Sequence, residues 1–142
     1  MTALPQISNP ASTSAGSVRD MPLVRAALLI DAVASGLTAA LLIAGADLLR
    51  DWLGLPVVLM REAGLILAVY VALVVVAATR AQVSPRAVWA VIVTNVVWAL
   101  ASFAILETGM IAPTTLGIVF VAGQALAVLA LGALQYAALR RS

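Results

Sequence analysis

Four long apolar segments constrain the fold of this chain more than any other feature. They run over about 23–46, 53–78, 87–106 and 116–139, and each reaches the roughly 20 residues that one helix needs to cross a bilayer. In hydrocarbon every backbone N–H and C=O needs a partner within the protein, so such segments cross as helices. A β-barrel would need short alternating strands, and these segments do not alternate. The sequence therefore predicts four transmembrane helices.

The composition excludes several classes of protein. Hydrophobic residues make up 64% of the chain and charged residues 10%, whereas soluble domains have about 45–50% and about 25%. The chain has no cysteine and no histidine, which removes disulfides, thiolate chemistry, the usual haem and zinc ligands and the usual general base. A net charge of +2 is too small to indicate nucleic-acid binding. We expect no cofactor, no metal and no catalytic residue, and therefore a non-enzymatic protein.

The short connections between the segments predict how the helices are arranged. Each connection holds too few residues for a soluble domain, and short connections make sequential helices lie antiparallel and adjacent. The expected fold is an all-α integral membrane protein, an antiparallel up-down-up-down four-transmembrane-helix bundle over residues 21–142. Residues 1–20 are rich in Ser, Thr, Pro and Ala and are interpreted as a disordered cytoplasmic N-terminal tail. The expected spans are 23–47, 56–79, 86–106 and 114–139, with residues 53–60 either inside the second span or at the membrane surface.

The arginines predict the orientation in the membrane. All eight basic residues are arginine, and the positive-inside rule places the arginine-rich side of a four-span protein in the cytoplasm. Only Arg50 falls clearly on the other side, with Arg61 near that boundary. We therefore expect a multi-pass protein of the cell membrane, a bacterial inner membrane, with both termini cytoplasmic. The arginines on the cytoplasmic side are Arg19, Arg25, Arg80, Arg86, Arg140 and Arg141.

Polar residues inside the apolar segments fall into two layers. A rise of about 1.5 Å per helical residue places Asp31 about 9 Å deep and the others of the inner layer at about 14–15 Å. This inner layer is a candidate intramembrane polar site of Asp31, Ser35, Tyr70 and Asn95. A second layer, about 20–29 Å deep, is a candidate outer polar cluster of Arg61, Glu62, Ser102 and Gln124, with Thr38 at the same depth.

Asp31 is the clearest indication of function, because a charge inside the bilayer costs about 2.5–3.5 kcal/mol or more. Asp31, Ser35 and Thr38 stand at i, i+4 and i+7, on one face of a helix. In one interpretation Asp31 takes up and releases a proton in a small exporter. In the other, which we favour, it is a structural carboxyl that bonds Asn95 or Tyr70, or one that reaches back towards Arg25.

The outer residues also allow two interpretations. Arg61 and Glu62 are adjacent and do not face each other on a helix, so each needs its own partner. They form either a gate or anion site, or an interfacial pair that marks the start of the second span. Asn95 and Gln124 are either substrate ligands or amides that hold helices together. Trp98 is either a platform for a flat cation or a large core side chain.

Two functional hypotheses follow. In the first, a non-enzymatic protein acts by helix packing with itself, as a homo-oligomer, or with a larger membrane-protein partner. The alternative is a small proton-coupled transporter or exporter with Asp31 as proton carrier and an unknown small-molecule substrate. The layout of four spans with one carboxylate in the first resembles the small multidrug resistance exporters. The Gly-rich and aromatic motifs of that family are missing here, so the resemblance is one of architecture alone.

Overall fold

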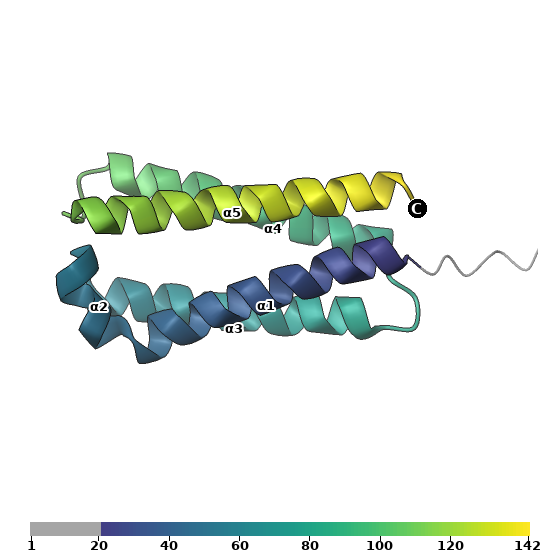
Figure 1. The fold of residues 1–142 in the computed structure, drawn as a ribbon, viewed down its shortest axis with the longest axis horizontal. Helices are drawn as coiled ribbons and strands as arrows, with labels where there is room; N and C mark the ends of the chain where they lie inside the picture. The colour runs from purple at the N-terminus through teal and green to yellow at the C-terminus, as the bar shows by residue number, and fades with distance from the viewer. Residues whose placement is uncertain (1–20) are drawn as a thin grey trace, which may run out of the picture.

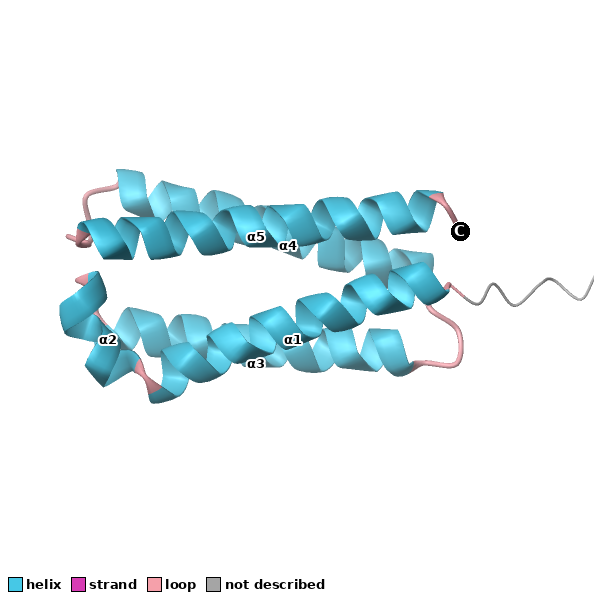
Figure 2. Cartoon of the chain, viewed as in Figure 1, coloured by secondary structure: helices cyan, strands magenta, loops and turns pink. Residues whose placement is uncertain are grey.

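The computed structural model describes residues 21–142, and the tail predicted for residues 1–20 lies outside them. This part of the chain is helical, with no strand (Figure 2). Four of its helices are long and apolar enough to cross a membrane, which confirms the prediction of four long apolar helices. In chain order the helices are α1 (Pro22–Ala44), α2 (Ala46–Leu53), α3 (Val57–Thr79), α4 (Pro85–Glu107) and α5 (Thr115–Arg140) (Figure 1).

Local sequence signals set the ends of these helices. Proline stands in the first turn of α1 and of α4, where its missing N–H costs no helical hydrogen bond. Thr114 caps α5 by accepting a hydrogen bond from the Gly117 N–H at 3.1 Å. Gly54 ends α2 with a φ of 66°, and a Cβ there would lie 2.8 Å from the Thr114 nitrogen. Glycine is therefore required at this turn.

The long helices associate unequally. The most extensive packing joins α1 to α3 and α4 to α5, and these two pairs meet mainly through α1 and α5 (Figure 1). By contrast, α3 and α4 touch little. The first residues of α1 and the last of α5 lie at one end of the molecule, and α2 lies at the other (Figure 1). We call these the arginine-rich end, which carries Arg25, Arg80, Arg86, Arg140 and Arg141, and the α2 end.

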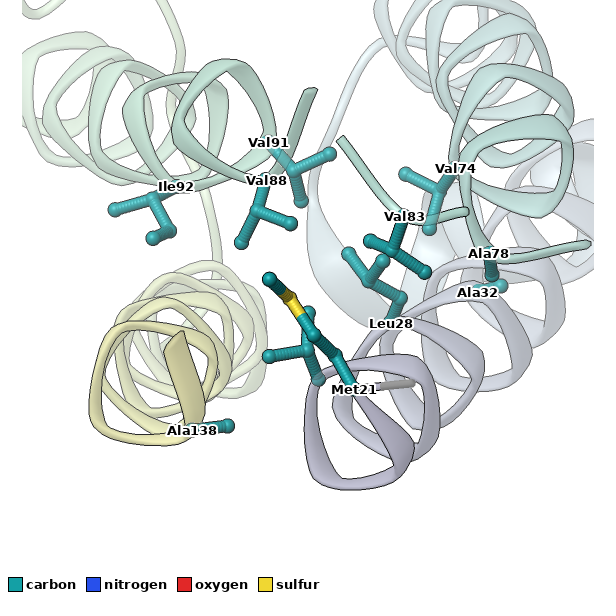
Figure 3. Close-up of a cluster of buried hydrophobic side chains, with 11 residues drawn as sticks. Met21, Leu28, Ala32, Val74, Ala78, Val83, Val88, Val91, Ile92 and Ala138 are labelled. Carbon is teal, nitrogen blue, oxygen red and sulfur yellow. The ribbon is translucent and has the colours of Figure 1, made fainter. Parts of the chain in front are cut away.

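The buried core extends along the interior between the helices. At the arginine-rich end, side chains such as Met21, Leu28 and Val88 meet at the centre (Figure 3). Towards the α2 end, a second cluster includes Leu42, Met60 and other apolar residues. Large apolar side chains also cover the outward faces, for example a leucine at position 37 that is 69% exposed. Such extensive apolar exposure suits a protein embedded in a membrane.

Helix α2 differs from the predicted connection. The sequence predicts a first span over 23–47 followed by a short joint, whereas α1 ends at Ala44 and residues 46–53 form a separate helix. The reason is that α2 is amphipathic: Ala46 and Leu53 are buried, and the charged residues between them are exposed. Residues 54–56 form a short non-helical connection, and α3 begins at Val57. Of residues 53–60, Leu53 therefore belongs to α2 and residues 57–60 to α3.

Candidate functional site

The side chain of Asp31 lies at the centre of the molecule and bonds all four long helices together. It is fully buried, with 0% of its surface exposed. Its Oδ1 accepts a hydrogen bond from Ser35 Oγ at 2.9 Å, one turn along α1. Its Oδ2 accepts from Tyr70 OH of α3 at 2.7 Å, from Asn95 Nδ2 of α4 at 2.9 Å and from Gln135 Nε2 of α5 at 2.6 Å. We call these five residues the Asp31 cluster.

The Asp31 cluster offers the carboxyl group four hydrogen-bond donors. The Asn95 and Gln135 amides donate to Asp31, the Ser35 and Tyr70 hydroxyls can donate as well, and an ionised carboxylate can accept from all four. Neither ion pair within residues 21–142 includes Asp31, so hydrogen bonds stand in for a counter-ion. A hydrogen bond to a charged group contributes about 1.5–3 kcal/mol, and four of them offset much of the cost of burying the charge.

The partners of Asp31 are also bonded to one another. Tyr70 OH lies 3.1 Å from Asn95 Oδ1, and Asn95 Nδ2 lies 3.3 Å from Gln135 Oε1. Gly132, about one turn before Gln135 on α5, lies against α4: a Cβ there would be 3.6 Å from the Asn95 Cβ. Within the described residues no buried side-chain nitrogen or oxygen lacks a partner. The cluster is therefore closed, and its geometry is fixed from several directions.

A second polar group lies nearer the α2 end. Trp98 Nε1 donates to Gln124 Oε1 at 2.9 Å, and Gln124 Nε2 donates to Ser102 Oγ at 2.9 Å. The Ser102 hydroxyl in turn donates to the Trp98 carbonyl at 2.8 Å. These three residues link α4 to α5. The bonds account for Ser102 and Gln124 of the predicted outer cluster and give the Trp98 indole a partner.

Arg61 and Glu62 separate in the structure. Arg61 turns towards α2 and forms an ion pair with Asp47 at 2.5 Å between Nη2 and Oδ2. Glu62 instead borders a cavity of about 250 Å³ that lies between the helices towards the α2 end. Ser102 and Gln124 border the same cavity, whereas Arg61 does not. Three of the four residues predicted for the outer cluster therefore share one space, and the fourth is paired elsewhere.

The cavity of the α2 half stops short of the Asp31 cluster. Its lining is mostly apolar and includes Ile66 and Trp98 but none of the five cluster residues. Ile66 and Trp98 also border a second, smaller cavity of about 30 Å³, which touches Tyr70 and Asn95. A space of this size holds about one water molecule. Asp31 itself borders neither cavity.

Sequence reasoning places Asp31, Ser35, Tyr70 and Asn95 in one layer, and the structure brings these four together. The sequence reasoning does not include Gln135 in this group. The spacing of Gln124 and Gln135 could have indicated it, because residues eleven positions apart lie on nearly the same face of a helix. On this face of α5 the Gln135 side chain points inward between the helices and is fully buried.

Residues 21–142 contain no group of three or more acidic residues that could hold a metal ion. Comparison with protein-family models, curated proteins and solved structures finds no significant match to this chain. The function is therefore argued from the residues and their geometry.

Proposed function

We propose that this chain is a small, non-enzymatic, multi-pass membrane protein that acts by helix packing with itself or with a larger membrane partner. It crosses the bilayer as an antiparallel four-helix bundle, with both ends of the described chain in the cytoplasm. The observation that carries the proposal is the closed Asp31 cluster. A carboxylate that accepts four hydrogen bonds from four helices, with no exposed surface, stabilises an arrangement of helices.

The orientation is supported by the distribution of charge. The five described arginines at one end have no described acidic residue beside them other than the buried Asp31. The α2 end carries Asp47, Asp51, Glu62 and Glu107, with two arginines. The positive-inside rule then assigns the arginine-rich end to the cytoplasm.

Cross-linking in native membranes tests the packing function. The chain has no cysteine, so single cysteines can be placed on the outward faces as Leu37→Cys (α1), Leu73→Cys (α3) and Leu126→Cys (α5), which are 69%, 65% and 60% exposed. Mild oxidation is expected to give a disulfide-linked dimer, or an adduct with one distinct membrane protein, from one of these faces. Ala99→Cys, at a fully buried position, is the control and should give neither. Failure of every outward position to give a specific adduct would contradict the proposal.

Proton-coupled transport is the second candidate, and the small cavity beside Tyr70 and Asn95 favours it, because both residues bond Asp31. Asp31→Asn separates the two functions. Asparagine keeps one oxygen for three of the donors, and the Ser35 hydroxyl can reverse to accept from the new amide. The helices therefore stay together, but the residue can no longer carry a proton.

The measurement is the decay of a pH gradient across proteoliposomes, followed with an enclosed pH-sensitive dye. The packing function predicts equally slow decay for the wild type and for Asp31→Asn. A carrier function predicts rapid decay for the wild type alone, in the presence of its substrate.

A further inference from the structure

A concavity of about 330 Å³ lies where α3, α4 and their connection meet, at the arginine-rich end. One wall is apolar and belongs to the two helices: Leu73, Val76, Ala77 and Ala87. Leu73 and Val76 are 65% and 50% exposed, so this wall continues onto the outward face of α3. The other wall is polar and comes from the connection: Arg80, Gln82 and Ser84.

The polar wall is made of three hydrogen-bond donors. No hydrogen bond or ion pair among residues 21–142 uses the side chains of Arg80, Gln82 or Ser84. Together they offer a guanidinium, an amide and a hydroxyl on one side of one concavity. A guanidinium binds phosphate through paired N–H groups. The polar wall therefore suits a phosphate group, and the apolar wall suits a hydrocarbon chain attached to it.

The charge around the concavity favours a ligand with net negative charge. Arg80 has Arg86 six residues further along and three more described arginines at the same end of the molecule. The only described acidic side chain in this half is that of Asp31, which is fully buried and fully bonded. A zwitterionic headgroup would place its own cation among these arginines, which repel it, whereas an anionic headgroup would not.

We propose that this concavity between α3 and α4 binds an anionic glycerophospholipid, with its phosphate on Arg80, Gln82 and Ser84 and an acyl chain along Leu73 and Val76. The weak packing of α3 against α4 leaves room for the chain between the two helices. Basic pockets at the ends of transmembrane helices recognise anionic headgroups in this way. The bound lipid fills the space between α3 and α4, where the two helices have few contacts with each other.

Native mass spectrometry of the purified full chain tests this assignment. The protein is released from detergent micelles that contain known amounts of phosphatidylglycerol or phosphatidylcholine, and the retained lipid is counted. One arginine near the headgroup contributes about 1 kcal/mol, which corresponds to about fivefold in affinity. We expect phosphatidylglycerol to bind at least about fivefold more tightly than phosphatidylcholine. Arg80→Gln is expected to remove about fivefold of its affinity.

Two further variants make the result specific. Arg141→Gln removes the same charge from the same end at a position that does not border the concavity, and should change the affinity by less than about twofold. Ala77→Leu fills the apolar wall and should weaken the binding of both lipids. Arg80 is exposed, so its replacement leaves the fold intact, which a melting curve verifies.

Three results would overturn the assignment. Equal losses in Arg80→Gln and Arg141→Gln would mean diffuse attraction to a positive surface. Equal retention of the two lipids would remove the anionic preference. Displacement of phosphatidylglycerol by millimolar inorganic phosphate would mean that the apolar wall adds nothing and that the site takes free phosphate. None of these results bears on the packing function, which rests on the Asp31 cluster.

Discussion

Individual side chains at the centre of this protein are held by several bonds at once, and this determines what their replacement costs. Gln135 is fully buried and donates to the Asp31 carboxylate at 2.6 Å. Gln124, eleven residues earlier on the same helix, bonds only neutral groups and is part-buried. Hydrogen bonds to charged groups are roughly twice as strong as neutral ones.

This difference gives a prediction for two matched substitutions on α5. Gln135→Leu should lower the free energy of unfolding by about 1.5–3 kcal/mol, because it removes a bond to a charge. Gln124→Leu should lower it by about 0.5–1 kcal/mol. The measurement is unfolding by titration with sodium dodecyl sulfate in bicelles, followed by tryptophan fluorescence. Equal losses in the two variants would mean that the charge on Asp31 contributes nothing.

At this scale the sequence predicts the layer of Asp31, Ser35, Tyr70 and Asn95, because depth along a helix follows directly from residue number. It does not predict the pairing of Arg61 with Asp47, which depends on how α2 folds back over α3. Adjacent residues on a helix point about 100° apart. This rotation explains why Glu62 borders the cavity and Arg61 does not.

Close approach of α1 and α3 depends on a single glycine of α3. A Cβ on Gly64 would lie 2.7 Å from the Ile43 Cγ1 and 3.1 Å from the Ala39 carbonyl oxygen. Neighbouring backbone and side chains of α1 would have to move to admit it. Gly123 of α5, by contrast, has open space, with nothing within 4 Å of an added Cβ.

The same substitution at these two glycines should therefore have opposite effects. Gly64→Ala should destabilise the protein by about 1–3 kcal/mol through overpacking. Gly123→Ala should stabilise it by about 0.5–1 kcal/mol, since alanine favours the helix. Thermal unfolding of both variants in one detergent provides the comparison. A melting temperature for Gly64→Ala at or above that of the wild type would contradict the close packing of α1 and α3.

The existence of the four long helices follows from the sequence, because apolar length alone decides it. The short helix α2 does not. From the sequence its eight residues are predicted to be a charged connection. They form a helix because Ala46 and Leu53 become buried against other elements. The pairing of α1 with α3 through Gly64 is likewise a property of packing, which small-residue patterns in an alanine-rich chain do not specify.

For the whole molecule, the asymmetry of charge between the two ends predicts which positions a polar reagent can reach. Gln82 lies in the connection at the arginine-rich end, and Met110, which is 81% exposed, lies at the α2 end. A membrane-impermeant maleimide added to intact, outer-membrane-permeabilised cells should label Met110→Cys and leave Gln82→Cys unlabelled. Lysis should expose Gln82→Cys. Labelling of Gln82→Cys before lysis would contradict the proposed orientation and indicate the opposite one.

The central claim is that the Asp31 carboxylate fastens four helices together, and the unfolding free energy of two variants in bicelles tests it most directly. Asp31→Leu leaves two buried amides and two hydroxyls without their acceptor and should cost about 2–4 kcal/mol. Asp31→Asn keeps one oxygen for three of these donors, the Ser35 hydroxyl can accept from the new amide, and the variant should stay within about 1 kcal/mol of the wild type. Buried charges are sometimes replaced by apolar side chains without loss. An Asp31→Leu protein as stable as the wild type would contradict the account.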